Sequence, residues 1–280
     1  MVFVRSIGAV LATTALAAFP VAASARTAQP IDNVPTSSAP DAPICTDRPT
    51  KSNFACTVPK GKWQVESDLY NYSRLSVGGV TTEAELFTSP VLKYGISDSA
   101  DVNIAWVPYA RVTTETGGVR TTADGVGDVV LRVKQRFTPT DRALQFSLIP
   151  YVKLPTAPRG IGNREAEGGI IAPANLSLPG SITLTVVPSL DLLSDADGRG
   201  HHVQLTGLVN IGKQIGRTTL YGELWTAQNF DPGGTIRQYS ADFAVAHLLN
   251  DELQLDVGGN FGLNAATPDV QLYAGISVRW

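Results

Sequence analysis

Three histidines are the side chains of this chain that are best suited to acid–base or metal chemistry. His201 and His202 follow the stretch "SDADGRG", in which Asp195 and Asp197 offer carboxylates. The spacing does not match a calcium-binding loop, and no serine partner for a histidine-assisted nucleophile can be identified. His247 shares a strand face with apolar residues near a short turn, which fits an interfacial position. We therefore predict a polar loop around His201 and His202, with neither a catalytic nor a metal-binding residue.

Other enzyme motifs are weak or missing in the sequence. The pair Gly212-Lys213 resembles part of a phosphate-binding loop, but it lacks the following Ser or Thr and lies within a predicted strand. The Gly-x-Ser-x-Gly pattern of a nucleophile elbow does not occur. We predict no cofactor. A lipase-like or protease-like enzyme that uses His201 or His202 stays open as an alternative.

The composition narrows the class of protein. Hydrophobic residues make up 43% of the 280 residues and charged residues only 17%, with a formal net charge of −3. A mildly acidic chain without a basic block is a poor nucleic-acid binder. After the N-terminal region no apolar run is long enough for a spanning helix. The remaining classes are an exported β protein and a β-barrel of the bacterial outer membrane.

The first 62 residues divide into two segments that precede the strands. Residues 1–25 have one early cation, Arg5, then an apolar stretch and a small-residue site, which is typical of a cleaved secretory signal. Residues 26–62 are rich in Pro, Ser and Thr and predict a flexible segment. This segment contains Cys45 and Cys56. Two cysteines in an exported protein favour a disulfide bond.

From Trp63 to the end the sequence alternates between apolar and polar residues, as strands with two different faces do. In residues 126–137, for example, Val129 and Leu131 oppose Arg132 and Lys134. The pattern predicts twelve strands: 63–76, 82–94, 100–113, 126–137, 143–156, 167–178, 181–193, 201–214, 218–230, 237–249, 252–264 and 269–280.

Three features favour an antiparallel transmembrane β-barrel over residues 63–280 rather than a periplasmic sandwich. The predicted strands are longer than those of most globular sheets. Short connections alternate with longer ones such as "TETGGVRTTADG", and aromatic residues gather near strand ends. An even number of strands places both ends of the barrel on the side of the short turns, which we expect to be the periplasm.

If the apolar faces meet lipid, the opposite faces carry charges of both signs into the lumen. One predicted strand is basic there, and three later strands, on the opposite side of the ring, are acidic. These charges either create a field across an open lumen or pair with one another and fill it. The lumen-lining candidates are Glu66, Asp68, Glu85, Arg111, Arg132, Lys134, Arg136, Lys153, Glu223, Asp242, Asp256 and Arg279.

Several stretches resemble an outer-membrane transporter family, the one described as "putative MetA pathway of phenol degradation". The similarity spans residues 46–280. The resemblance implies an outer-membrane β-barrel that transports small molecules, with a link to aromatic compounds, and it brings no catalytic residues. The stretches that carry it are "TDRPT" (46–50), "VPKGKWQVES" (58–67), "LKYGISD" (92–98), "GVGDVVLRVKQRF" (125–137), "LPTA" (154–157) and "GLNAATPDVQLYAGISVRW" (262–280).

The last predicted strand, "YAGISVRW", resembles the C-terminal signal that barrel-assembly machinery recognises. Tyr273, Gly275, Val278 and Trp280 occupy the positions of that signal. We therefore expect outer-membrane lipid, the assembly machinery and periplasmic chaperones as partners, besides a small solute. The predicted function is a solute channel of the outer membrane, with a barrel enzyme or a closed structural barrel as alternatives.

Overall fold

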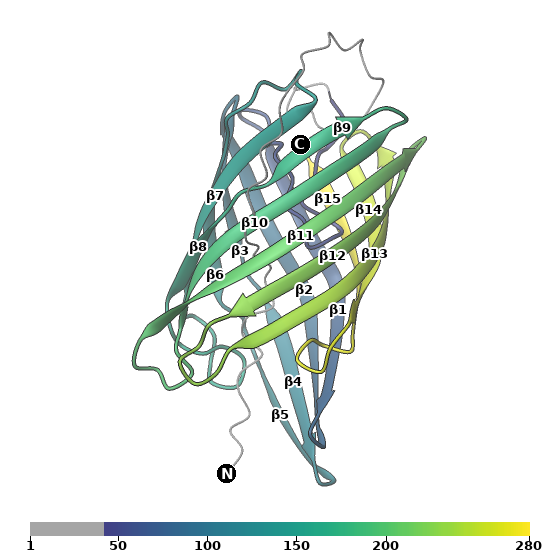
Figure 1. Ribbon diagram of the computed structural model, residues 1–280. Coiled ribbons are helices and arrows are strands. Elements are labelled where there is room, and N and C mark those ends of the chain that lie inside the picture. Colours follow the sequence, from purple (N-terminus) through teal and green to yellow (C-terminus); the bar gives the residue numbers. More distant parts are fainter. Residues whose placement is uncertain (1–41) are drawn as a thin grey trace.

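The computed structural model describes residues 42–280, and in this range the chain forms a closed antiparallel β-barrel (Figure 1). No helix in the described range is both long and apolar enough to cross a membrane. The strands are β1 (Trp63–Val77), β2 (Val80–Ser97), β3 (Ala100–Ala105), β4 (Tyr109–Thr116), β5 (Val119–Gly125), β6 (Val129–Arg136), β7 (Leu144–Leu154), β8 (Glu167–Ile171), β9 (Ala174–Leu178), β10 (Ile182–Ser194), β11 (His201–Ile215), β12 (Thr218–Asn229), β13 (Ile236–Asn250), β14 (Leu253–Gly262) and β15 (Val270–Arg279).

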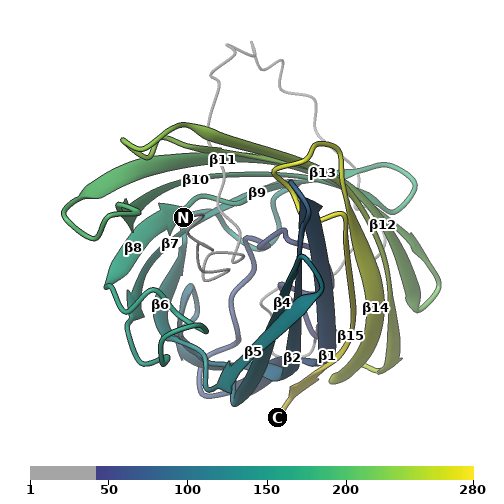
Figure 2. The same cartoon turned by 90° about the horizontal axis from the view of Figure 1, so that it is seen from below.

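The predicted twelve-strand barrel is confirmed. The ring closes because β1 pairs with β2 on one side and with β15 on the other (Figure 2). Two of the predicted strands, 100–113 and 167–178, are each interrupted, the first into β3 and β4 and the second into β8 and β9. In addition β5 and β6 follow one another along a third course of the sheet, beside β4 and β3. Pro108 and Pro173 lie in the breaks of the two interrupted strands, where a residue without a backbone N–H cannot donate to a sheet.

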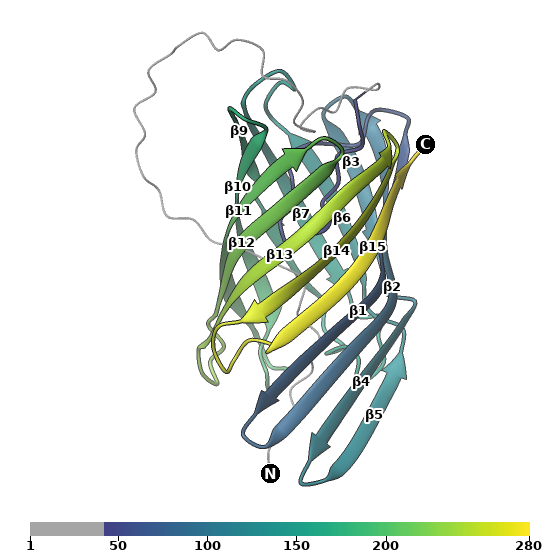
Figure 3. The ribbon, with the colours of Figure 1, turned by 90° about the vertical axis from the view of Figure 1, so that its right-hand side faces the viewer.

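One predicted connection is wrong. Residues 114–125 were expected as a long outer loop, but they form most of a hairpin between β4 and β5. The four Thr residues and Val119 in this stretch suit strands, and Gly117 and Gly118 turn the chain with φ angles of 57° and 80°. Among the described strands β5 pairs only with β4, and this hairpin extends with β1 and β2 beyond the rest of the ring (Figure 3).

The strands have one apolar face outward and one polar face inward. In β13, Phe243 is 61% exposed on the outside while the neighbouring Asp242 is 0% exposed in the interior. Because apolar side chains face outward around the ring, the outer surface matches that of barrels embedded in lipid. The inside must therefore accommodate the polar and charged side chains.

The start of β1 and the end of β15 lie at the same end of the barrel. Trp63 N–H donates to Trp280 O (3.0 Å), and Trp280 N–H donates to Trp63 O (2.9 Å). The tight turns such as Gly216-Arg217 lie at this end, as expected for the periplasmic side. The predicted signal segment 1–25 lies outside the described residues. From residue 42 the chain enters the barrel before it begins β1 (Figure 2).

Candidate functional site: a plug docked on the lumen wall

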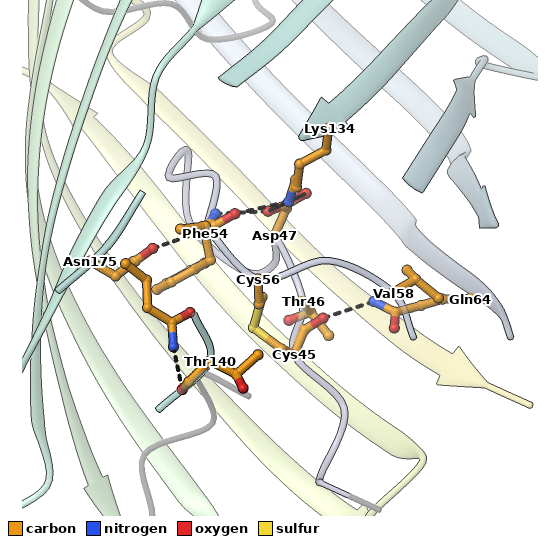
Figure 4. The surroundings of a disulfide bond; sticks show 12 residues. Cys45, Thr46, Asp47, Phe54, Cys56, Val58, Gln64, Lys134, Thr140 and Asn175 are labelled. Carbon is orange, nitrogen blue, oxygen red and sulfur yellow. Dashed lines mark hydrogen bonds and ion pairs between the residues drawn. A yellow bond between two sulfur atoms is a disulfide. The ribbon is translucent and has the colours of Figure 1, made fainter. Parts of the chain in front are cut away.

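Residues 44–58, here called the plug, lie inside the barrel near the end with the short turns. Ile44 (1% exposed) and Ala55 (0%) are among its most buried residues. The predicted disulfide between Cys45 and Cys56 is confirmed, and it closes the plug into a loop (Figure 4). The composition of the leader predicted a flexible segment, whereas this part of it packs against the wall along its length. The reason is a set of ion pairs that the leader alone does not reveal.

Asp47, the acidic residue of the plug, docks on the basic side of the lumen wall. Lys93 Nζ donates to Asp47 Oδ2 (2.6 Å), and Lys134 Nζ donates to Asp47 Oδ1 (2.8 Å). Lys134 also donates to the plug carbonyl of Phe54 (2.9 Å) (Figure 4). Burial alone would raise the pKa of Asp47, but the charges of Lys134 and Lys93 outweigh it and hold this pKa well below its usual range.

Arg48 docks on the acidic side, between two carboxylates. Its Nη1 donates to Asp68 Oδ1 (2.6 Å), and its Nη2 and Nε donate to Asp256 Oδ1 (2.6 Å) and Oδ2 (3.1 Å). The guanidinium carbon lies 5.9 Å from the ring centre of Tyr273. A Cβ atom at Gly275 would lie 2.1 Å from Arg48 Nη2, so the missing side chain makes room for the guanidinium.

Lys51 docks on a second group of acidic wall residues, next to the group that binds Arg48. Its Nζ donates to Asp242 Oδ2 (2.7 Å) and to Ser240 Oγ (2.8 Å), and it lies 4.8 Å from the ring centre of Trp225. Its backbone N–H donates to Glu223 Oε1 (3.2 Å). Burial lowers the pKa of Lys51, although the carboxylate of Asp242 opposes this shift.

The backbone after the plug is fixed at Gly95 of β2. Gly61 N–H donates to Gly95 O (2.8 Å), and Gly95 N–H donates to Lys62 O (3.1 Å). A Cβ atom at Gly95 would lie 2.1 Å from Pro59 O. Glycines in two stretches of the sequence, "LKYGISD" and "YAGISVRW", thus provide space for the segment that leads into β1.

Two cavities border the plug. One of about 40 Å³ lies toward the short turns and is lined by Ile44, Phe54, Ser181 and Arg217, among others. The other, of about 210 Å³, lies toward the longer loops and is lined by plug residues 47–53 and by wall residues that include Trp225. The plug therefore lies between these two cavities.

Part of the inner wall is apolar. Ile149, Ile171, Val187 and Leu208 form a buried cluster, and Tyr151 and Trp225 pack against it. Neighbouring strands contribute these residues, since Ile149 is opposite Ile171 and Leu208 is opposite both Val187 and Trp225. Ile171 and Trp225 reach the larger cavity, which therefore has an apolar side and an acidic side.

The structure places most of the predicted lumen-lining residues inside the ring. Arg132 is partly exposed and lines the larger cavity. Glu85 and Arg111 lie apart from the others, 3.7 Å from each other, on the part of β2 and β4 that extends beyond the ring. The buried candidates are Glu66, Asp68, Lys134, Arg136, Lys153, Glu223, Asp242, Asp256 and Arg279.

Some of these buried charges do not touch the plug. Lys153 Nζ lies 2.8 Å from Glu167 and 3.4 Å from Asp128, and Arg279 Nε donates to Glu252 Oε2 (2.5 Å). Some of the lumen charges therefore pair with one another on the wall, as the hypothesis of a charge-filled lumen expected. Much of the remaining lumen charge pairs with the plug.

Sequence reasoning did not assign Asp47, Arg48 and Lys51 to the lumen. These residues lie in the stretch "TDRPTK", between the two cysteines. An acid and two bases inside a disulfide loop are a signal of a structured segment, but the Pro-rich and Ser-rich residues before it concealed that signal. Their partners on the wall come from strands far along the chain, as the 208-residue separation of Arg48 and Asp256 shows.

The histidines do not form a common site. His202 Nδ1 lies 2.9 Å from Asp195 Oδ1 in the outer part of the barrel, while His247 Nδ1 lies 2.9 Å from Thr218 Oγ1 near a short turn. Within residues 42–280, no three His, Cys, Asp or Glu side chains gather as a set of metal ligands.

A solved structure shares this fold. An outer-membrane channel from Pseudomonas putida F1 superimposes with a TM-score of 0.61 at 15% identity, covering 86% of this chain and 99% of that one. The translocator domain of the autotransporter NalP from Neisseria meningitidis gives a TM-score of 0.48 at 12% identity, covering 79% and 89%. Among curated proteins, none matches this sequence. The family described as "Putative MetA-pathway of phenol degradation" matches residues 46–280, and the chain belongs to this family.

Proposed function

We propose that this protein is a channel of the bacterial outer membrane for small solutes. The observation that carries the proposal is a lipid-facing barrel whose interior has cavities on both sides of a docked plug. The family and the fold shared with an outer-membrane channel support it. The chain acts as a passive conduit and not as an enzyme, and it is exported by its N-terminal signal.

The solutes of this channel include aromatic or hydrophobic compounds. The family description refers to phenol degradation, and the apolar cluster around Ile171 and Trp225 offers a surface for such compounds. Aromatic rings pack favourably on indole and aliphatic side chains.

The plug is the gate in this proposal. It lies between the two cavities, so solutes pass only when the plug shifts or leaves the lumen. Ion pairs keep it in place, and the disulfide limits how far it can unfold.

Reconstitution in planar bilayers and in solute-loaded vesicles tests this function. We expect low conductance for the wild type. Asp47→Asn, which removes the partner of Lys93 and Lys134, is expected to raise both conductance and solute efflux. Lys60→Ala is the matched control, because Lys60 is an exposed lysine just after the plug. No conductance and no efflux from a folded Asp47→Asn barrel would disprove the channel.

Efflux of benzamide and hexanamide from vesicles containing Asp47→Asn tests the aromatic preference. We expect faster efflux of benzamide, and loss of this difference when Trp225→Ala is added. Equal rates for both amides before that substitution would argue against an aromatic solute.

A further inference from the structure

Two neighbouring positions on the acidic side of the wall are similar in chemistry. Each places carboxylates and one aromatic ring around a cationic residue of the plug, on strands between β12 and β1. Asp68 and Asp256 pair with the Arg48 guanidinium beside Tyr273. Asp242 pairs with the Lys51 ammonium beside Trp225, and Glu223 accepts a hydrogen bond from the Lys51 backbone N–H.

Their geometry is suited to organic cations. Asp256 accepts two hydrogen bonds from one guanidinium, which is the bidentate arrangement that guanidinium groups favour. Gly275 leaves space for that group, because a Cβ atom there would overlap it. The indole of Trp225 lies 4.8 Å from the ammonium of Lys51, within range of a cation–π interaction.

The wall carries more acid than base where it meets the plug. Among residues 42–280, the carboxylates in contact with residues 44–58 are Glu66, Asp68, Asp101, Glu223, Asp242 and Asp256, and the wall cations in contact with them are Lys93 and Lys134. Departure of the plug therefore leaves a net acidic wall.

The basic side and the acidic side of the lumen wall also differ in the ion pairs that remain after the plug leaves. On the basic side Lys93 keeps Glu66, 2.5 Å away. On the acidic side, the ion pairs of Asp68, Asp242 and Asp256 within the described residues are all with the plug. When the plug leaves, these three carboxylates lose their cations and face the open lumen, where a solute cation can take the vacated place.

We propose that the lumen wall carries two binding sites for organic cations, of the guanidinium and alkylammonium classes, which Arg48 and Lys51 occupy in the closed state. When the plug moves, solute cations bind there, and the open lumen prefers cations to anions. This inference rests on the proposed channel function for the selectivity, whereas cation binding can be measured without transport.

Calorimetry of the folded full chain in detergent tests the sites directly. We expect ethylguanidinium to bind Arg48→Ala and butylammonium to bind Lys51→Ala, because each substitution vacates one site. We expect at least severalfold weaker binding to the wild type and to Lys60→Ala. Adding Asp256→Asn to Arg48→Ala, or Asp242→Asn to Lys51→Ala, is expected to abolish binding. Heat-modifiable migration on gels verifies that every variant is folded.

The reversal potential of Arg48→Ala/Lys51→Ala in a KCl gradient tests the selectivity. We expect K⁺ to be favoured severalfold over Cl⁻, with the preference reduced by Asp242→Asn/Asp256→Asn. Absence of cation binding to the folded single variants overturns the two sites, and a pore that favours Cl⁻ overturns the selectivity. Cation binding without conductance in any variant would instead refute the proposed channel function.

Discussion

Arg48 reaches two carboxylates at once because the wall beneath it lacks a side chain at Gly275. The sequence suggested a different role for this glycine, as part of a signal for barrel assembly. The structure adds a reason that is local and steric, and the two roles can be separated by experiment. A defect in plug docking leaves the barrel intact, whereas a defect in assembly does not.

Gly275→Ala is expected to displace the guanidinium and weaken plug docking by about 3 kcal/mol, the scale of breaking a buried ion pair. The added Cβ would also lie 2.5 Å from Ser67 O of β1, so heat-modifiable migration is used to select the folded barrel, whose bilayer conductance should rise. Gly222→Ala is the matched control, because a Cβ atom there would have no heavy atom within 4 Å. Loss of the folded barrel in Gly275→Ala alone would favour the assembly role.

The ionisation of the Asp47 carboxylate determines how plug docking depends on pH. Its pKa is lowered in the docked state, so its contribution is fully present above the ordinary aspartate pKa of about 4 and is lost as the pH falls through the lowered value. We expect equal wild-type conductance at pH 7 and pH 5, and a rise only below about pH 4. A conductance that rises between pH 7 and pH 5 would contradict this assignment.

At the scale of single residues, the sequence predicts which wall charges face inward and leaves their partners undetermined. Alternation along β13 suffices to place Asp242 inside, because neighbouring side chains point to opposite faces. It cannot indicate that Lys51 is the partner, since that contact joins residues 191 positions apart. Glu85 and Arg111 alternate in the same way, yet their strands extend beyond the ring.

At the scale of elements, the strands were predictable and the plug was not. The strands repeat one simple pattern, and their boundaries agree with the structure except where Pro residues interrupt them or where Gly117 and Gly118 form a hairpin. The plug has no repeating pattern. Its conformation depends on a disulfide and on charges that the barrel supplies.

The disulfide bond is expected to stabilise the docked conformation of the plug. Replacing Cys45 and Cys56 by Ser removes a crosslink across 11 positions, worth about 2–3 kcal/mol in the chain-entropy treatment. We expect an intact barrel with higher conductance, because the plug leaves the lumen more easily. Reduction of the wild type by dithiothreitol should reproduce this increase and have no effect on the variant. Identical conductance before and after reduction would show that the crosslink does not hold the gate.

At the scale of the whole molecule, the barrel depends on the seam between β1 and β15. Trp280 closes this seam with two backbone hydrogen bonds to Trp63, and the residue is 55% exposed at the end of the barrel with the short turns. We expect truncation after Arg279, or a charged extension after Trp280, to lower the amount of folded barrel in outer-membrane fractions. Phe in place of Trp280 should assemble normally, because it keeps both the backbone bonds and an aromatic ring. Normal insertion of the truncated chain would contradict the predicted assembly signal.

The position of Arg48 also has a consequence for the order of folding. Its two partners come from β1, the strand that follows the plug, and from β14, which is formed almost at the end of the chain. A nascent barrel can offer Asp68 early, but Asp256 arrives only with the last hairpin. Complete docking of Arg48 therefore requires a strand from each end of the barrel to be in place, so the plug reaches its docked conformation late in folding.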